Sequence, residues 1–211
     1  MEFCASLSLK DIALQRGDRL LIKGLSLSLE KGDAIELRGA NGTGKTTLLR
    51  AIAGLHQQKF GQIIFSGMDD AANNEYVVLM GHLDAIKSNE SVLAQLEFWD
   101  DFFGTPRGEI NAHIKRLEIE RLLPLMGGGL SAGQKRRVAL VRALISKRPI
   151  WLLDEPFAPL DTKGRQILGK ILDEHRENGG IIIAAVHDEP PCKPMQKLDL
   201  AQYQIRENAD V

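Results

Sequence analysis

The sequence has little cysteine and no long hydrophobic run. Its 211 residues include two cysteines, Cys4 and Cys192, which lie near opposite ends of the chain without metal-ligand spacing. A disulfide framework needs more cysteines than this. The most apolar run, residues 181–186, is six residues long, whereas a membrane-spanning helix needs roughly 20. We therefore expect reduced thiols and no membrane-spanning helix.

An excess of charge of one sign is also missing. The 27 basic side chains nearly cancel the 28 acidic ones, and the formal net charge is −1. This balance argues against a nucleic-acid partner recognised by overall charge. The first residues, Met1-Glu2-Phe3-Cys4, contain no basic segment followed by an apolar stretch, so we expect no secretory signal. These features favour the cytoplasm.

Hydrophobic periodicity predicts the fold class. Residues 150–153 and 181–186 are continuous apolar runs, which are typical of parallel strands covered on both faces. A helix over 163–177 would connect them as a crossover. From about residue 82 to 146 the pattern is helical. We predict an α/β core interrupted by a helical lobe. Further elements expected in the first third are strands at 6–9, 25–29, 34–37, 62–65 and 76–79, with a helix at 45–53.

A glycine-rich segment follows the strand at 34–37 and precedes a helix. Gly39-Ala40-Asn41-Gly42-Thr43-Gly44-Lys45-Thr46 fits the phosphate-binding pattern G-x-x-x-x-G-K-[ST], and Thr47 comes next. The glycines let backbone N–H groups surround an anion, and the helix dipole adds to the attraction. Lys45 would neutralise the β- and γ-phosphates, while the Thr46 hydroxyl would coordinate Mg²⁺. The alternative is a glycine-rich turn with an incidental lysine.

An acidic pair ends the strand at 150–153. Asp154 and Glu155 would emerge at the carboxyl edge of the sheet, where ligands bind in parallel α/β folds. Asp154 would hold Mg²⁺ directly or through water, and Glu155 would polarise the attacking water. The alternative is an acidic turn after a strand. Together the two motifs predict an NTPase, without indicating which kind.

Three further segments resemble one family. Leu130-Ser131-Ala132-Gly133-Gln134 resembles the signature motif of ATP-binding cassette (ABC) ATPases, with Ala132 where glycine is commoner. Ala158-Pro159-Leu160-Asp161 looks like the D-loop of that family, and His187 occupies the position of its switch histidine. All five elements occur in the family's order. Taken alone, the signature segment would be an ordinary helix start with a serine cap.

The resemblance covers essentially the whole chain and implies a fold. This is a P-loop NTPase (ABC ATPase) core with an antiparallel β subdomain and an inserted α-helical lobe. Residues 1–211 would form one nucleotide-binding domain. Within it, 1–81 and 147–211 make the catalytic core and 82–146 make the lobe.

The resemblance also implies a dimeric mechanism. Two cassettes would pack head to tail as a homodimer, with ATP and Mg²⁺ between one subunit's phosphate loop and the other's signature. Ser131 and the Gly133 backbone would then touch the γ-phosphate held by Lys45 of the second copy. Glu155 would act as general base and His187 would steady the γ-phosphate. Integral membrane subunits of an ABC complex are the other partners implied.

Two positions depart from the family pattern. Leu14-Gln15-Arg16-Gly17 contains no aromatic residue to stack on adenine. Arg16 either stacks its guanidinium plane on the base or is a solvated turn arginine. The glutamine of the Q-loop is replaced by Gly81-His82. His82 can still donate or accept a hydrogen bond, and whether it contacts Mg²⁺ or the attacking water stays open.

One of these departures, together with two other segments, resembles the sequences of one branch of the family. Gly81-His82 with Ala85-Ile86-Lys87, and Trp151 to Phe157, are similar to the ATP-binding subunits of the cytochrome c maturation system, which are haem exporters. The similarity implies a peripheral protein on the cytoplasmic face of a bacterial-type inner membrane. Three alternatives remain: the ATPase of another small exporter (lipid, metal or drug), a soluble cassette acting on ribosomes or DNA, and a cassette that binds nucleotide without hydrolysis.

Overall fold

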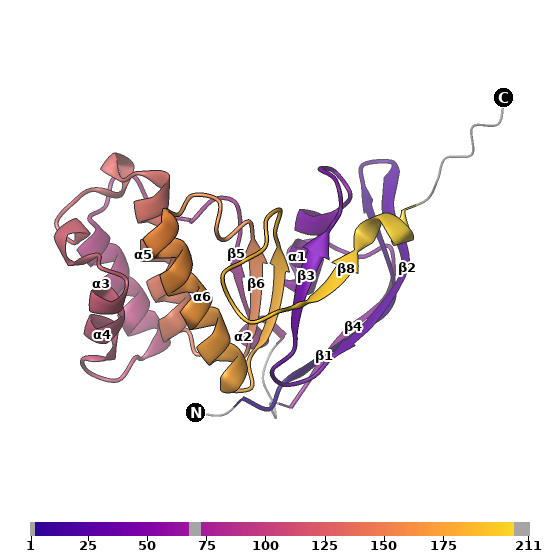
Figure 1. Ribbon diagram of the computed structural model, residues 1–211, viewed down its shortest axis with the longest axis horizontal. Helices are drawn as coiled ribbons and strands as arrows, with labels where there is room; N and C mark the ends of the chain where they lie inside the picture. The colour runs from indigo at the N-terminus through magenta and orange to yellow at the C-terminus, as the bar shows by residue number, and fades with distance from the viewer. Residues whose placement is uncertain (1–2, 68–72, 205–211) are drawn as a thin grey trace.

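A computed structural model describes residues 3–67 and 73–204 of the chain. The first strands form an antiparallel sheet in the order β2-β1-β4. Its members are β1 (Ser6–Arg16), β2 (Arg19–Leu29) and β4 (Phe60–Ser66). A turn at Gly17 and Asp18 connects β1 to β2, so Arg16 and Arg19 face each other across the end of the hairpin. This sheet is at the right of Figure 1, and it is the antiparallel β subdomain that the family resemblance implied.

The second sheet is parallel, and its order among the described residues is β5-β6-β7-β3-β8. The sequence had predicted that strand β5 begins at residue 76. The strand begins instead at Val77, because Tyr76 ends a short helix, α2. Strand β8 was not predicted from the sequence. The strands are β3 (Ala34–Arg38), β5 (Val77–Met80), β6 (Ile150–Asp154), β7 (Ile181–Ala185) and β8 (Gln196–Asp199); α2 is Asn73–Tyr76.

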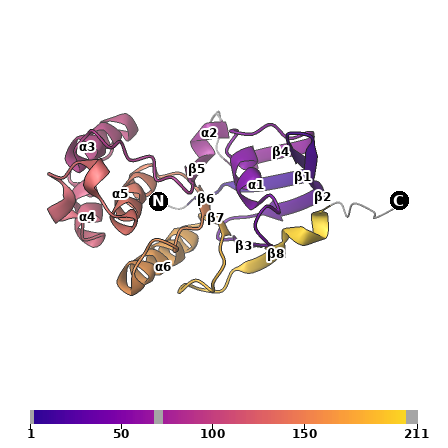
Figure 2. The same cartoon turned by 90° about the horizontal axis from the view of Figure 1, so that it is seen from above.

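Both faces of the parallel sheet are covered, which explains the apolar runs. Alternate side chains of a strand point to opposite faces, and on β6 Ile150 and Leu152 join one hydrophobic cluster while Trp151 and Leu153 join another. The first cluster includes α1 (Lys45–Ile52) and the antiparallel sheet. The second includes α5 (Ala132–Ile145) and α6 (Thr162–Glu177). Figure 2 shows α1 and α6 on opposite sides of the parallel strands.

The segment between β5 and β6 is helical. It contains α3 (Val92–Phe103), α4 (Glu109–Arg116), two 3-10 turns, η1 (Glu120–Leu122) and η2 (Gly127–Gly129), and α5. These elements lie together at the left of Figure 1. A buried ion pair, 3.0 Å from Arg136 Nε to Asp84 Oδ1, ties α5 to the segment after β5. The domain boundaries at 81/82 and 146/147 stay a prediction.

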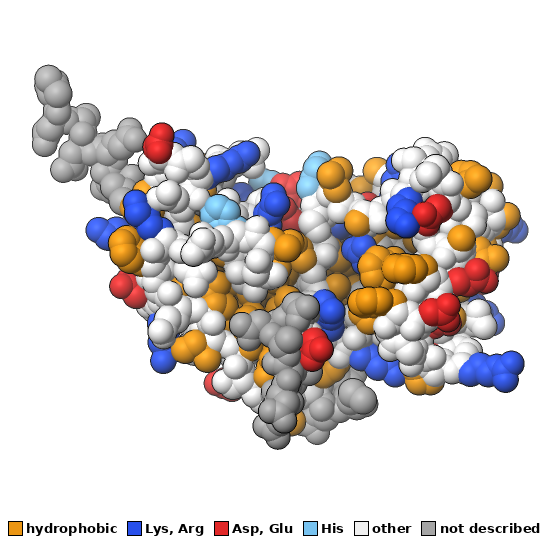
Figure 3. Space-filling model, turned by 180° about the vertical axis from the view of Figure 1, so that it is seen from behind, with side chains coloured by type: hydrophobic (Ala, Val, Ile, Leu, Met, Phe, Trp, Pro, Cys, Tyr) orange, Lys and Arg blue, Asp and Glu red, His pale blue; other side chains and the backbone are white. Residues whose placement is uncertain are grey.

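Hydrophobic side chains gather on one face of this helical region, at the right of the reversed view in Figure 3. On α3, the side chains of Phe98 and Phe102 are exposed, at 54% and 63%. Every helix in the described ranges is too short or too polar to cross a bilayer.

The proline-rich segment from Pro190 to Pro194 crosses α6 and leads the chain back to the sheet. It passes so close to Gly169 that a Cβ there would lie 2.0 Å from the carbonyl oxygen of Pro191. The Arg176 guanidinium donates to the carbonyl oxygens of Lys193 (3.1 Å) and Pro194 (3.3 Å). The segment therefore places β8 beside β3; η3 (Leu200–Tyr203) follows.

Candidate nucleotide site

The predicted phosphate loop connects β3 to α1. Gly39 and Gly44 have φ values of 134° and 105°, in the region that favours glycine. A Cβ on Gly39 would lie 2.9 Å from Thr43 Oγ1, and one on Gly44 would lie 3.2 Å from Ile22 Cδ1. The tight path of the loop depends on these two glycines. Helix α1 begins at Lys45, as predicted, so its N-terminal amides face the loop.

The side chain of Lys45 is folded over the loop. Its Nζ donates to the carbonyl oxygens of Gly39 (2.6 Å) and Ala40 (3.2 Å), and the residue is only 7% exposed. Thr43 Oγ1 also donates to the Ala40 carbonyl at 2.9 Å. The ammonium is thus held at the centre of the loop, where it can meet an anion.

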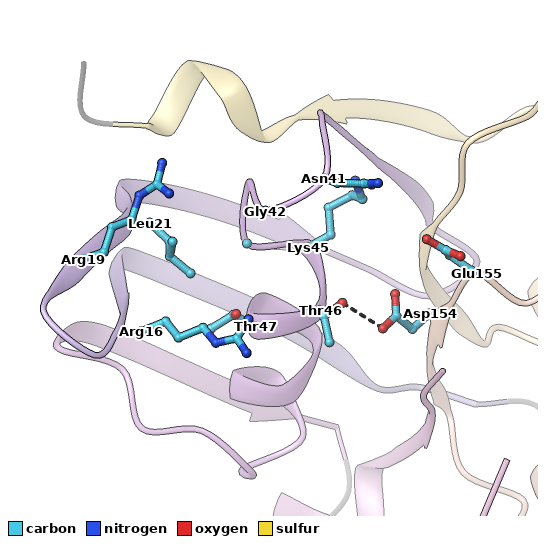
Figure 4. A pocket seen from close by; sticks show the side chains of 11 residues that line it. Arg16, Arg19, Leu21, Asn41, Gly42, Lys45, Thr46, Thr47, Asp154 and Glu155 are labelled. Atoms are coloured by element: carbon cyan, nitrogen blue, oxygen red, sulfur yellow. Dashed lines mark hydrogen bonds between the residues drawn. The ribbon is translucent and has the colours of Figure 1, made fainter. Parts of the chain in front are cut away.

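The acidic pair lies directly opposite α1. The Thr46 hydroxyl donates to Asp154 Oδ2 across 2.8 Å, and Asp154 is 5% exposed. Figure 4 shows this bond between the two elements. A hydroxyl and a carboxylate this close offer two of the hard oxygen ligands that Mg²⁺ prefers, with waters and phosphate oxygens able to supply the rest.

The backbone of Glu155 turns sharply. Its φ of 49° is unusual for a non-glycine residue, and its N–H donates to the Ala185 carbonyl at 2.9 Å. Strained backbone of this kind clusters at functional sites. The side chain of Glu155 meets the segment that follows β7, where Glu155 Oε1 and His187 Nε2 are 2.9 Å apart. The two predicted catalytic residues therefore touch.

A cavity of about 390 Å³ joins the phosphate loop to the acidic pair. Arg16, whose contact with the base stays a prediction, is one of the residues that line it. Arg19 and Leu21 also line it, although neither was predicted from the sequence. For Arg19 the turn-forming pair Gly17-Asp18 was the available signal, because a turn there places Arg19 opposite Arg16 across the hairpin. The lining residues, drawn in Figure 4, are Arg16, Arg19, Leu21, Asn41, Gly42, Gly44, Lys45, Thr46, Thr47, Asp154 and Glu155.

The signature segment borders a separate cavity of about 540 Å³, which Ser131 to Gln134, Arg137 and Asp161 help to line. Ser131 caps α5: its Oγ accepts from the Gln134 N–H at 3.3 Å, and Gln134 Oε1 accepts from the Ser131 N–H at 2.8 Å. Leu130 packs in the core at 6% exposure. No residue of the described chain lines both this cavity and the phosphate-loop cavity.

The match to known proteins agrees with this geometry. The ABC transporter family model matches residues 22–158, a range that includes the phosphate loop, the signature and the acidic pair. The chain belongs to the ABC transporter family. It is accordingly a nucleotide-binding ATPase, the cassette of a transporter complex with membrane partners.

Relatives within the family extend over nearly the whole chain. A "Cytochrome c biogenesis ATP-binding export protein CcmA" from Maricaulis maris is 40% identical, and the match covers 94% of this chain and 93% of the relative. A protein of the same name from Paramagnetospirillum magneticum is 37% identical over 96% and 97% of the two chains. An ABC transporter ATP-binding protein from Pyrococcus furiosus has a solved structure with a TM-score of 0.79, 25% identity and coverage of 95% and 100%.

The residues at the Q-loop and D-loop positions, His82 and Asp161, have different surroundings. His82, at the Q-loop position, is exposed and does not line the phosphate-loop cavity. Asp161, in the D-loop, caps α6 by accepting from the Gly164 N–H at 2.8 Å and pairs with Arg137 at 2.7 Å. These two donors hold the pKa of Asp161 below its usual value. The D-loop also touches the signature, because a Cβ on Gly133 would lie 2.7 Å from the carbonyl oxygen of Pro159.

Proposed function

We propose that this chain is the ATP-hydrolysing subunit of a membrane ABC complex that serves cytochrome c maturation, where ATP turnover drives haem export and release of a haem-loaded chaperone. The observation that carries the proposal is the cavity in which the phosphate loop faces the acidic pair. The names of the relatives, which are cytochrome c biogenesis export proteins, support the choice of pathway. The protein would work as a peripheral subunit on the cytoplasmic face of the inner membrane.

ATP would lie with its phosphates on the loop. The amides from Gly39 to Thr47, with Lys45, would bind the phosphate oxygens, and Arg16 would stack on the adenine. The Thr46 hydroxyl and the Asp154 carboxylate, 2.8 Å apart, fit a hard divalent cation and would hold Mg²⁺. When bound there, the ion neutralises charge on the phosphate oxygens.

Hydrolysis would depend on Glu155. Its carboxylate would accept a proton from the attacking water, and His187, 2.9 Å away, would orient that carboxylate and steady the γ-phosphate. The side chain of Glu155 is 32% exposed, so water can reach it. Exclusion of water from the phosphate end of the site would strengthen the interactions between the phosphates and the charged side chains around them.

The second half of each ATP site would come from another copy of the chain. The signature cavity lies apart from the phosphate-loop cavity, so Ser131 and Gly133 would reach the γ-phosphate in a head-to-tail homodimer. Ser131 stands at the start of α5, where the helix dipole favours an anion. ATP would then hold the interface together and hydrolysis would release it.

Genetics tests the pathway. Deleting the gene should abolish covalently attached haem in a stain of cellular proteins, and the wild-type gene should restore it. A gene encoding Glu155→Gln should fail, whereas Glu177→Gln, which changes a glutamate 58% exposed on α6, should succeed. Normal c-type cytochromes after deletion would contradict the cytochrome c assignment and would favour another export substrate, without affecting the ATPase assignment.

A further inference from the structure

Arg38 lies at the end of β3, immediately before the phosphate loop, and belongs to none of the motifs above. Its guanidinium contacts two groups. Nε and Nη2 donate to Glu36 Oε2 at 3.0 and 2.5 Å. Nη1 donates to the backbone carbonyl oxygen of His187. One side chain therefore connects the strand that enters the phosphate loop with the residue that touches Glu155.

Glu36 fixes the direction of this side chain. Glu36 is 3% exposed in the middle of β3, between β7 and β8. A buried carboxylate needs a charged partner, and the ion pair with Arg38 supplies one. Because Nε and Nη2 are committed to Glu36, the planar fork leaves Nη1 for another acceptor. The parallel register, with Leu37 opposite Ala185, brings His187 within its reach.

His187 has few other restraints. The residue follows β7, its side chain is 50% exposed, and the two residues after it are also exposed. Within the described residues, its ring makes one hydrogen bond, to Glu155. The Arg38 contact is thus the side-chain contact that holds the backbone of His187 while its ring faces Glu155.

We propose that Arg38 is a positioning residue, which holds the backbone of His187 so that the imidazole stays against Glu155 during ATP hydrolysis. This inference rests on the proposed roles of His187 and Glu155. Arginine is required because its fork reaches Glu36 and the carbonyl of His187 at once, whereas a lysine ammonium can neutralise Glu36 without bridging the two.

A mutant cycle on the full chain tests the proposal by steady-state ATP hydrolysis. Arg38→Lys should lower kcat about tenfold, the lower end of the effect of losing a hydrogen bond from a charged group, with KM for ATP within about twofold. In a His187→Ala background the same change should lower kcat by less than about twofold, because its effect passes through His187. The matched control is Arg116→Lys, which alters another two-pronged Arg–Glu pair, with Glu174 on α6, and should leave kcat unchanged.

The outcomes separate the two proposals. A His187→Ala chain with wild-type kcat would overturn the role of His187 and, with it, that of Arg38. A normal kcat for Arg38→Lys, or a full additional loss in the His187→Ala background, would overturn the positioning role alone. If Arg38→Lys does not fold, the double variant Glu36→Gln/Arg38→Met removes the buried charge together with its partner. It should show the same loss of kcat, and a wild-type value would overturn the proposal.

Discussion

The Thr46 hydroxyl donates to Asp154 across 2.8 Å, which joins the first turn of α1 to the end of β6. Asp154→Asn keeps an oxygen that can accept this bond but removes the negative charge. We expect the Mg²⁺ concentration for half-maximal hydrolysis to rise about tenfold or more, since a neutral amide is a weaker ligand than a carboxylate. Measuring ATPase activity against Mg²⁺ concentration gives this half-maximal value. Asp101→Asn, at an exposed position of α3, is the control; an unchanged titration for Asp154→Asn would contradict the proposed metal role.

Glu155→Gln should separate binding from hydrolysis. The amide cannot accept a proton from water, so we expect kcat to fall by about 10²- to 10⁴-fold. ATP affinity should stay close to wild type, because Lys45 and the loop amides are untouched. Equilibrium binding of a fluorescent ATP analogue, together with the hydrolysis rate, checks both expectations. A normal rate would show that Glu155 is not the base.

Gly133→Ala should impair hydrolysis through the contact between signature and D-loop. The new Cβ would meet the carbonyl oxygen of Pro159 at 2.7 Å, so one of the two segments must move. We expect kcat to fall about tenfold or more, because a shift of about 1 Å in a residue that positions the substrate can already lower the rate of catalysis strongly. Gly129→Ala, where a Cβ meets nothing within 4 Å, is the matched control. Equal rates for the two variants would argue against the importance of this contact.

The Arg136–Asp84 pair should contribute strongly to stability. The side chains are 2% and 10% exposed, and burial raises the pKa of Asp84 despite its partner. Arg136→Met leaves a buried carboxylate unpaired, and we expect a loss of about 3–5 kcal/mol in the free energy of unfolding. Arg136→Met/Asp84→Leu should recover most of it. Urea denaturation gives the values; Arg116→Met, at a surface pair, should cost at most about 1 kcal/mol.

His175 should make stability depend on pH. It is 8% exposed and stacks on Trp151, and burial lowers its pKa from 6.5 to about 4. Between those values the unfolded chain binds more protons, so the free energy of unfolding should fall as the pH is lowered through this window, by about 3 kcal/mol in all. His175→Phe should remove this part of the pH dependence. Urea denaturation at pH 7 and pH 4.5 measures it, and identical pH profiles for variant and wild type would contradict the assignment.

The parts of the fold that the sequence predicted correctly are those with a local signal. Strands β6 and β7 are apolar because both of their faces are covered, and their limits were close to the predicted ones. Helix α5 begins at Ala132, directly after Ser131, and therefore has the serine cap that the signature segment indicated. Strand β8 was missed because Gln196–Asp199 is a mostly exposed edge strand without apolar alternation.

In the candidate site, too, the residues that could be predicted are those with a local sequence signal. The phosphate loop and the acidic pair are contiguous motifs, so their residues were identified individually. Contacts between distant segments, such as Arg38 with His187, depend on the register of β3 and β7 and have no local pattern. His82 was a candidate from its position after β5 alone, and the fold leaves it outside the phosphate-loop cavity.

The place of β3 in the sheet has a consequence for synthesis on the ribosome. Both of its neighbours, β7 and β8, come from residues 181–199, although β3 itself ends at residue 38. The strand that carries the phosphate loop therefore leaves the exit tunnel long before either neighbour exists, and both of its edges are unpaired in the nascent chain. The ATP site is encoded early but can be assembled only late in translation, and a chaperone that shields unpaired strand edges would act during that interval.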